Sequence, residues 1–181
     1  MAAAKPKPPL TVSRAALLAD GDDRRFRHFV HDTLAFAARI QAVRSGFAGL
    51  VGLSDAGYSI LISVSHLQDG DGVGINGIAE HLHLSGAFVT IEVGKLVKRG
   101  LIDKEIHPDD RRRVLLTLTA AGRAALAALA PMQRQVNDTL FESLSTDDFR
   151  RLAVIMGTLT ACGDRALSLL HLLAEQRRMR A

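Results

Sequence analysis

The chain has 181 residues, of which 48% are hydrophobic, and its mean hydropathy is +0.13. This composition excludes a largely disordered protein, and the length allows one domain with a substantial core, or two small lobes that share long helices. The formal net charge of +4 permits an anionic partner without requiring one, so charge alone does not predict nucleic-acid binding.

The N-terminal sequence predicts a tail rather than a targeting signal. Residues 1–9 are rich in Ala, Lys and Pro and lack the apolar core of a secretory signal, so we expect them to be disordered. The chain has no uninterrupted apolar stretch of about 18 residues. A single cysteine, Cys162, cannot form an intramolecular disulfide. We therefore expect a cytoplasmic protein that has no membrane partner.

The first half of the chain predicts a series of helices. A short helical stretch to Ala19 ends at an Asp-rich break, and a long helix follows with apolar residues at three- and four-residue spacing. A second helix begins near Ser54, a third is capped by Asn76, and a fourth runs from Ser85 to Gly100, whose residue type suits a helix C-terminus.

The second half predicts a hairpin and then two helical regions. Two apolar-rich runs, 101–107 and 114–119, flank a polar, basic tip at 108–113. The following helix is expected to kink or split at Pro131, and Ser145 begins the last helix. That helix carries a heptad-like apolar seam, which needs a partner surface and predicts that Cys162 is a buried, inert thiol. The seam comprises Leu152, Ile155, Leu159, Cys162, Ala166, Leu169 and Leu173.

Two short helices followed by a two-stranded hairpin are the order of a winged helix-turn-helix. The predicted fold class is mainly α, with a small β-hairpin wing and long N- and C-terminal helices for dimerisation. The predicted organisation is a tail, an N-terminal helical part of the dimerisation region, a winged helix-turn-helix and C-terminal dimerisation helices, at 1–9, 10–52, 53–122 and 123–181.

The same stretch resembles the MarR family of transcriptional regulators over about 70 residues. The matching residues are Leu53-Ser54, Ile78-Ala79-Glu80-His81-Leu82, Ser85 through Val89-Thr90, Leu96, Lys98-Arg99-Gly100-Leu101-Ile102, Asp109-Asp110-Arg111-Arg112 and Leu118-Thr119-Ala120-Ala121-Gly122. The resemblance implies a homodimer that binds double-stranded DNA at a pseudo-palindromic operator, in most cases as a repressor, and it implies no enzyme activity and no cofactor.

The resemblance also implies which residues touch DNA. Ser85, Thr90 and Lys95 would contact phosphates or base edges from the recognition helix. Arg111 or Arg112 would enter the minor groove, with Asp110 orienting the arginine. Each residue also has a simpler interpretation: Ser85 as a helix cap only, Thr90 as helix surface, and the wing tip as an ordinary solvated turn.

The sequence departs from the family pattern in the recognition helix. Ile91 and Glu92 follow Thr90 where a basic residue is common, Gly94 replaces an acidic one, and Val97 a polar one. The segment from Asn76 to Thr119 contains seven Lys and Arg residues and six Asp and Glu residues, so its net charge is only +1. These departures support an alternative function: a protein-interaction module that reuses the winged fold without sequence-specific DNA binding.

Regulators of this family usually lose DNA affinity when a small, often aromatic, anion binds. The resemblance makes Arg39 a candidate carboxylate partner, with His31 and Tyr58 as polar groups, for an aromatic acid or its thioester. The simpler interpretation is the stronger one, because an arginine such as Arg39 is more often a solvated helix residue and a tyrosine such as Tyr58 is more often part of the core. No metal site is predicted, because His28 and His31 lack further ligands, and no motif for catalysis is present.

Overall fold

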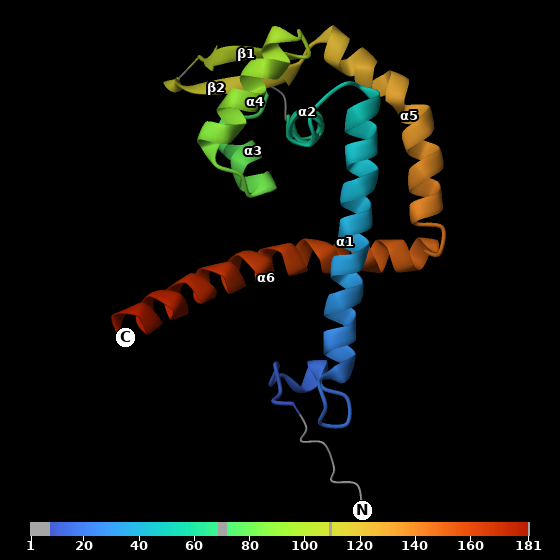
Figure 1. The fold of residues 1–181 in the computed structure, drawn as a ribbon. Coiled ribbons are helices and arrows are strands. Elements are labelled where there is room, and N and C mark those ends of the chain that lie inside the picture. Colours follow the sequence, from blue (N-terminus) through green and yellow to red (C-terminus); the bar gives the residue numbers. More distant parts are fainter. Residues whose placement is uncertain (1–7, 69–71, 109, 181) are drawn as a thin grey trace, which may run out of the picture. The chain divides into compact units, whose positions relative to one another are not determined.

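The structure is a computed structural model that describes residues 8–68, 72–108 and 110–180, without the side chains of Arg111 and Arg112. The described elements are a 3-10 turn (Ala15–Leu17), α1 (Arg24–Leu50), α2 (Asp55–Leu67), α3 (Ile75–Leu82), α4 (Gly86–Lys98), β1 (Ile102–His107), β2 (Asp110–Leu118), α5 (Ala120–Leu140) and α6 (Thr146–Met179) (Figure 1). The predicted fold class, helices with a hairpin wing, is confirmed. Most of the predicted tail, 1–7, lies outside the described residues.

The chain divides into two units, Met1–Gln133 and Arg134–Ala181. Asp23, the residue just before α1, binds the start of the described chain. The Thr11 backbone N–H and the Thr11 hydroxyl both donate to Asp23 Oδ2 at 2.7 Å. These two hydrogen bonds hold the pKa of the Asp23 carboxyl below its usual value, and Arg27 pairs with the same group. The short helix expected before Ala19 is only a three-residue 3-10 turn.

Serine side chains begin α2 and α4, as the sequence predicts. Ser54 Oγ accepts a hydrogen bond from the Gly57 N–H at 3.0 Å, and Ser85 Oγ accepts one from the Phe88 N–H at 3.2 Å. Such caps satisfy backbone donors that have no partner in the first helical turn. Both helices therefore begin where the sequence places them.

The prediction that Asn76 caps α3 is wrong, because Gly74 is the N-cap and the helix begins two residues earlier than predicted, at Ile75. Val73 pairs with Leu116 through N–H···O distances of 3.0 and 2.9 Å, which extends the backbone up to the start of the helix. Asn76 consequently lies inside the first turn of α3.

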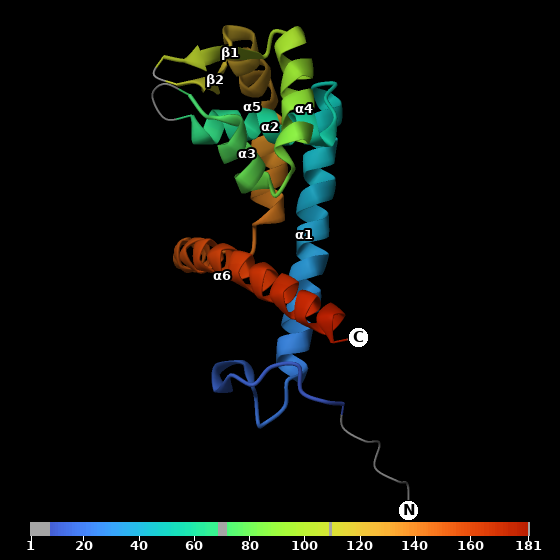
Figure 2. The same cartoon turned by 90° about the vertical axis from the view of Figure 1, so that its left-hand side faces the viewer.

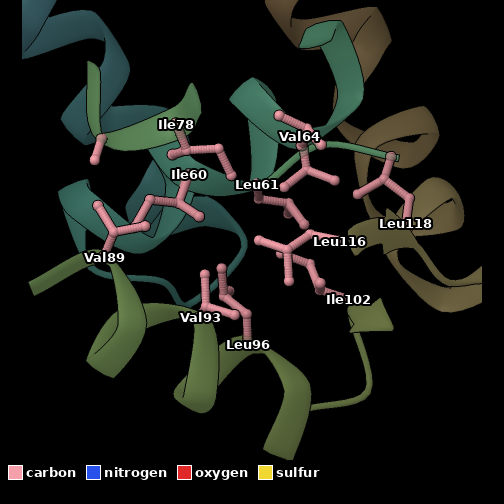
Figure 3. Packing of buried hydrophobic residues seen from close by; sticks show 12 residues of the cluster. Ile60, Leu61, Val64, Ile78, Val89, Val93, Leu96, Ile102, Leu116 and Leu118 are labelled. Atoms are coloured by element: carbon pink, nitrogen blue, oxygen red, sulfur yellow. The ribbon is translucent and has the colours of Figure 1, made fainter. Parts of the chain in front are cut away.

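Apolar side chains from α2, α3, α4 and the hairpin meet in one core (Figure 3). Ile60, Leu61 and Val64 of α2 lie opposite Val89, Val93 and Leu96 of α4, and all six are buried. The cluster is completed by three residues in or just before α3 and three of the strands, which are Val73, Ile78, Ala79, Ile102, Leu116 and Leu118. A shared core of this kind fixes α4 relative to the hairpin.

The hairpin is an antiparallel pair in which Ile102 lies opposite Leu118 and His107 opposite Asp110. The prediction that the second strand begins at Val114 is wrong, since β2 begins at Asp110. The register shifts between Ile106 and His107, which absorbs the difference in strand length. The basic residues 111–113 therefore belong to a strand and not to the turn.

The hairpin is joined tightly to the first turn of α5. Thr119 Oγ1 donates to the Gly100 carbonyl at 2.6 Å and accepts from the Gly122 N–H at 2.9 Å, and Arg123 donates to the Leu118 carbonyl at 2.6 Å. A Cβ on Gly122 would overlap the Leu101 carbonyl oxygen, closer than real Cβ atoms come. Glycine is therefore required at position 122. The helix then continues unbroken through Pro131, so the predicted split is wrong.

The second unit contains the end of α5 and the 34-residue helix α6, which Ser145 caps by accepting from the Asp148 N–H at 3.2 Å. No residue of α6 is buried in the described chain. The seam residues from Ile155 to Leu173 are exposed, and so is Cys162, contrary to the prediction of a buried thiol. Because the described residues leave the seam uncovered, Cys162 is exposed along with it.

By length and composition alone, helix α6 is long and apolar enough to cross a membrane. The bent pair of α1 and α2 would also be long and apolar enough if the two helices formed one span. Asp164 and Arg165 interrupt the apolar sequence near the middle of α6. Charged residues at the centre of a bilayer are costly, so the composition of α6 fits an interhelical seam better than a membrane span.

Candidate nucleic-acid interface

Helix α3 lies beside α4 and packs against strand β2 (Figure 2). An open groove lies where the starts of the two helices meet this strand. Its volume is about 570 Å3, and it is lined by Gly74, Ile75, Asn76, Gly77, Gly86, Thr90, Arg113 and Val114. The first N–H groups of α3 have no partner within the helix, and a helix N-terminus attracts anions. Together with the Arg113 guanidinium from β2, they make the groove suitable for a phosphate group.

The predicted contact residues of α4 lie on its exposed side. Ser85 and Thr90 are exposed, and Thr90 Oγ1 donates to the Gly86 carbonyl at 2.8 Å. Ser85 caps α4, which agrees with its simpler interpretation as a helix cap. Its side chain is still exposed at the N-terminus of the helix. The Lys95 side chain is 62% exposed.

Glu92 points into the lobe rather than outward, with 4% of its surface exposed. Its carboxylate accepts a hydrogen bond from Ser54 Oγ at 3.1 Å and one from Lys95 Nζ at 2.5 Å. The bond from Lys95 holds the pKa of Glu92 below its usual value, against the opposing effect of burial. The negative charge of Glu92 is thus paired with Lys95 inside the lobe and does not face the surface that carries Thr90.

Arg99, just after α4, binds the turn between α1 and α2. Its guanidinium donates to the Gly52 carbonyl at 2.5 Å and to the Val51 carbonyl at 3.3 Å. Gly52 has a φ of +63°, a backbone conformation that glycine adopts without strain. Glu92 and Arg99 together fasten α4 to the turn that precedes α2, and sequence reasoning assigned neither of them this role.

The wing residues predicted to enter the minor groove are at the start of β2. Asp110 pairs with His107 in the strand register, and Arg111 and Arg112 follow it in the same strand. The side chains of Arg111 and Arg112 lie outside the described residues. Arg113, which the prediction did not include, is exposed and lines the groove beside α3.

Tyr58 lies in a second polar cluster, away from the groove. Its ring is 2% exposed, the Arg44 guanidinium lies 5.5 Å from the ring centroid, and Gln133 Nε2 donates to the phenolic oxygen at 2.8 Å. Arg44 also donates to Ser59 Oγ at 3.3 Å. Burial raises the pKa of the Tyr58 phenol, which therefore stays protonated at neutral pH.

The other two residues predicted to bind a ligand are not brought to Tyr58. Arg39 donates to the Ala35 carbonyl of its own helix at 2.7 Å and is exposed. His31 precedes Arg44 by 13 positions, which is about 20 Å along α1. The cation that contacts Tyr58 is Arg44, and the signal for it is its three-residue spacing from the buried Phe47. Within the described part of the chain, no three His, Cys, Asp or Glu side chains cluster as metal ligands.

The fold and the groove together define a winged helix-turn-helix protein. The family model described as "MarR family" matches residues 52–113 of the chain. Residues 52–113 of this chain are therefore similar to the MarR family, and the resemblance inferred from the sequence is confirmed over that stretch.

The chain is also similar to other proteins in sequence, and to solved structures in fold. The chain is 28% identical over 85 residues to a Bacillus subtilis protein named "Uncharacterized HTH-type transcriptional regulator YwhA", a match that covers 47% of this chain and 61% of that relative. It is similar in fold to CouR from Rhodococcus jostii RHA1 bound to p-coumaroyl-CoA, at 20% identity and a TM-score of 0.60, covering 68% of this chain and 85% of that one.

A second solved structure is a mutant of S. aureus MepR bound to an oligodeoxyribonucleotide. It has 18% identity and a TM-score of 0.50, covering 74% of this chain and 96% of that one. At these identities the two structures support the fold.

Proposed function

We propose that this chain is a DNA-binding transcriptional regulator, a repressor that acts in the cytoplasm. The observation that carries the proposal is the groove lined by the start of α3, by Thr90 of α4 and by Arg113 of β2. In a winged helix-turn-helix, the recognition helix α4 enters the major groove and the wing reaches the backbone or the minor groove. The DNA-bound MepR structure, a protein of similar fold, supports this docking.

The proposed DNA contacts follow from this docking. Ser85 and Thr90 contact phosphates or base edges, and Arg111 or Arg112 enters the minor groove with Asp110 as the orienting carboxylate. Lys95 is exposed enough to reach a phosphate, but Glu92 neutralises part of its charge. The wing and the groove therefore supply most of the attraction for DNA.

We further propose that the protein acts as a homodimer. The exposed apolar seam of α6 and the exposed Phe29 and Leu34 of α1 require a partner, and a second copy of the chain presents the same surfaces. Two modules related by a twofold axis would read the two halves of a pseudo-palindromic operator. Sedimentation of the purified chain at twice its monomer mass of 19.5 kDa supports the dimer, whereas recovery only with membranes contradicts it.

The cluster around Tyr58 is our candidate for ligand response. A buried phenol, a cation over its ring and an amide donor would suit a small aromatic acid or its thioester. CouR, of similar fold, was solved with p-coumaroyl-CoA, which supports this chemical class. His31 and Arg39 remain proposed ligand contacts, and they would act from a different part of α1.

Binding to DNA across a series of salt concentrations tests the proposed function. Fragments of the DNA upstream of the protein's own gene should bind, with affinity that falls steeply as salt rises, because phosphate contacts release counterions. Arg112→Ala should weaken binding and reduce the slope of log affinity against log salt by about 1 per module. No binding to any fragment would favour a protein-interaction module. The inward position of Glu92 removes one argument for that alternative.

A further inference from the structure

The outer face of the recognition helix has an unusual chemistry for a surface that binds DNA. Val89, Val93 and Leu96 point into the core, so the opposite side of the helix is formed by residues about half a turn away. We define this outer face as Ala87, Ile91, Gly94 and Lys98.

Most of the outer face is apolar or has no side chain. Ile91 is 60% exposed, Ala87 is exposed, and a Cβ built on Gly94 would meet nothing within 4 Å. Thr90, beside Ile91, donates its hydroxyl hydrogen to the Gly86 carbonyl and leaves its methyl group available. Between Gly86 and Lys98, which are all described, the cations are Lys95 and Lys98, and Lys95 is bonded to Glu92.

Each base presents a different group in the major groove. Guanine is read by Arg or Lys, adenine by Asn or Gln, and thymine by apolar contact with its C5-methyl group. The sequence from Gly86 to Lys98 contains no Arg, Asn or Gln, so the pairs that read guanine and adenine with two hydrogen bonds are largely missing. Lys95 is bonded to Glu92 and Lys98 lies at one end of the face, so the chemistry available along the rest of the face is that which contacts thymine.

We propose that α4 reads thymine C5-methyl groups in the major groove, with Ile91 as the specificity-determining residue and Ala87 and the Thr90 methyl beside it. This inference rests on the proposed DNA-binding function and specifies the class of sequence that the site selects. The operator half-site carries thymines opposite the middle of α4.

The charges around the outer face favour DNA as the occupant rather than an apolar protein surface. Lys98 lies at one end of the face, and the groove with Arg113 and the N-terminus of α3 lies beside its other end. An apolar strip bordered by groups that attract phosphates matches a major groove, where methyl groups lie between two phosphate backbones.

Replacing thymine by uracil tests the inference, because uracil keeps the hydrogen-bonding groups of thymine and lacks the methyl. Duplexes are first selected from a random library by the full chain, and the best one is then made with thymine or with uracil. We expect uracil to weaken binding roughly fourfold for each contacted methyl group. In Ile91→Ala the thymine and uracil duplexes should bind nearly equally.

Lys98→Ala is the matched control on the same face. It should weaken both duplexes equally and flatten the salt dependence, leaving the ratio of the two affinities unchanged. Thermal unfolding checks that both variants fold, and exposed positions give no reason for a large loss.

The outcomes separate this inference from the proposed function. Tight, salt-dependent binding with equal affinity for the two duplexes overturns thymine reading and leaves DNA binding intact. A thymine preference that is unchanged in Ile91→Ala overturns the role of Ile91. Failure to select any duplex overturns both the inference and the proposed function.

Discussion

Replacing Glu92 by glutamine isolates the charge of a side chain that lies inside the lobe. Gln keeps the shape of the side chain and an oxygen that can accept from Ser54, but it removes the negative charge paired with Lys95. Hydrogen bonds to charged groups contribute more than neutral ones, whereas an ion pair with an exposed lysine is screened by water. We therefore expect a loss of about 1 kcal/mol in the free energy of unfolding, a fall in Tm of about 2–4 °C.

The same change should strengthen the electrostatic part of DNA binding. Without Glu92 the Lys95 ammonium keeps its full charge, so the slope of log affinity against log salt should steepen by up to about 0.9 per module. The slope would be measured by fluorescence anisotropy of labelled DNA at salt concentrations from about 50 to 300 mM. Glu80→Gln, an exposed change on α3, is the control and should raise affinity only slightly.

The pH dependence gives a further check on Glu92. Its pKa in the folded protein lies below the ordinary value of 4.5, so its stabilising effect is complete above that value and is lost as the pH falls through the folded pKa. The difference in stability between the parent protein and Glu92→Gln should therefore shrink in acid. A difference that is independent of pH, together with an unchanged salt slope, would refute the pairing of Glu92 with Lys95 in solution.

Two other substitutions test two separate features, the junction of the hairpin with α5 and the proposed ligand site. Gly122→Ala should lower Tm by several degrees, because its Cβ would overlap the Leu101 carbonyl. Gly94→Ala is the control and should leave Tm unchanged or raise it slightly. Equal effects of the two substitutions on Tm would contradict the close contact at Gly122. Tyr58→Phe removes the bond from Gln133 and should cost about 1 kcal/mol in stability. It should also abolish any rise in Tm on adding phenolic acids, and a rise of equal size in the variant would remove Tyr58 from the proposed ligand site.

Local signals in the sequence predicted much of the fold. The caps at Ser54, Ser85 and Ser145 were correct because a serine cap depends on a few neighbouring residues. The start of α3 was missed because it depends on Val73 pairing with Leu116, a contact between residues distant in sequence. The exposure of Cys162 was missed because the seam was expected to be covered, whereas the described residues bury no part of α6.

The candidate site was less predictable than the fold. Glu92 follows Val89 by three positions and precedes Leu96 by four, a spacing that places it on the buried side of the helix. This signal was present in the sequence, but a buried carboxylate needs a partner, and Ser54 lies 38 positions earlier. Which cation contacts Tyr58 likewise depends on how α1 packs against α2. The resemblance to the family pointed to Arg39, whereas the contact is made by Arg44.

The contact at Gly122 has a mechanical consequence. Three hydrogen bonds and one close backbone contact leave no hinge between the hairpin and the first turn of α5. When the direction of that turn changes, the hairpin must turn with it, because bending at the junction would break those bonds. The orientation of the strand is therefore set by the start of α5, and under the proposed function a substitution there would alter DNA binding without touching a nucleotide.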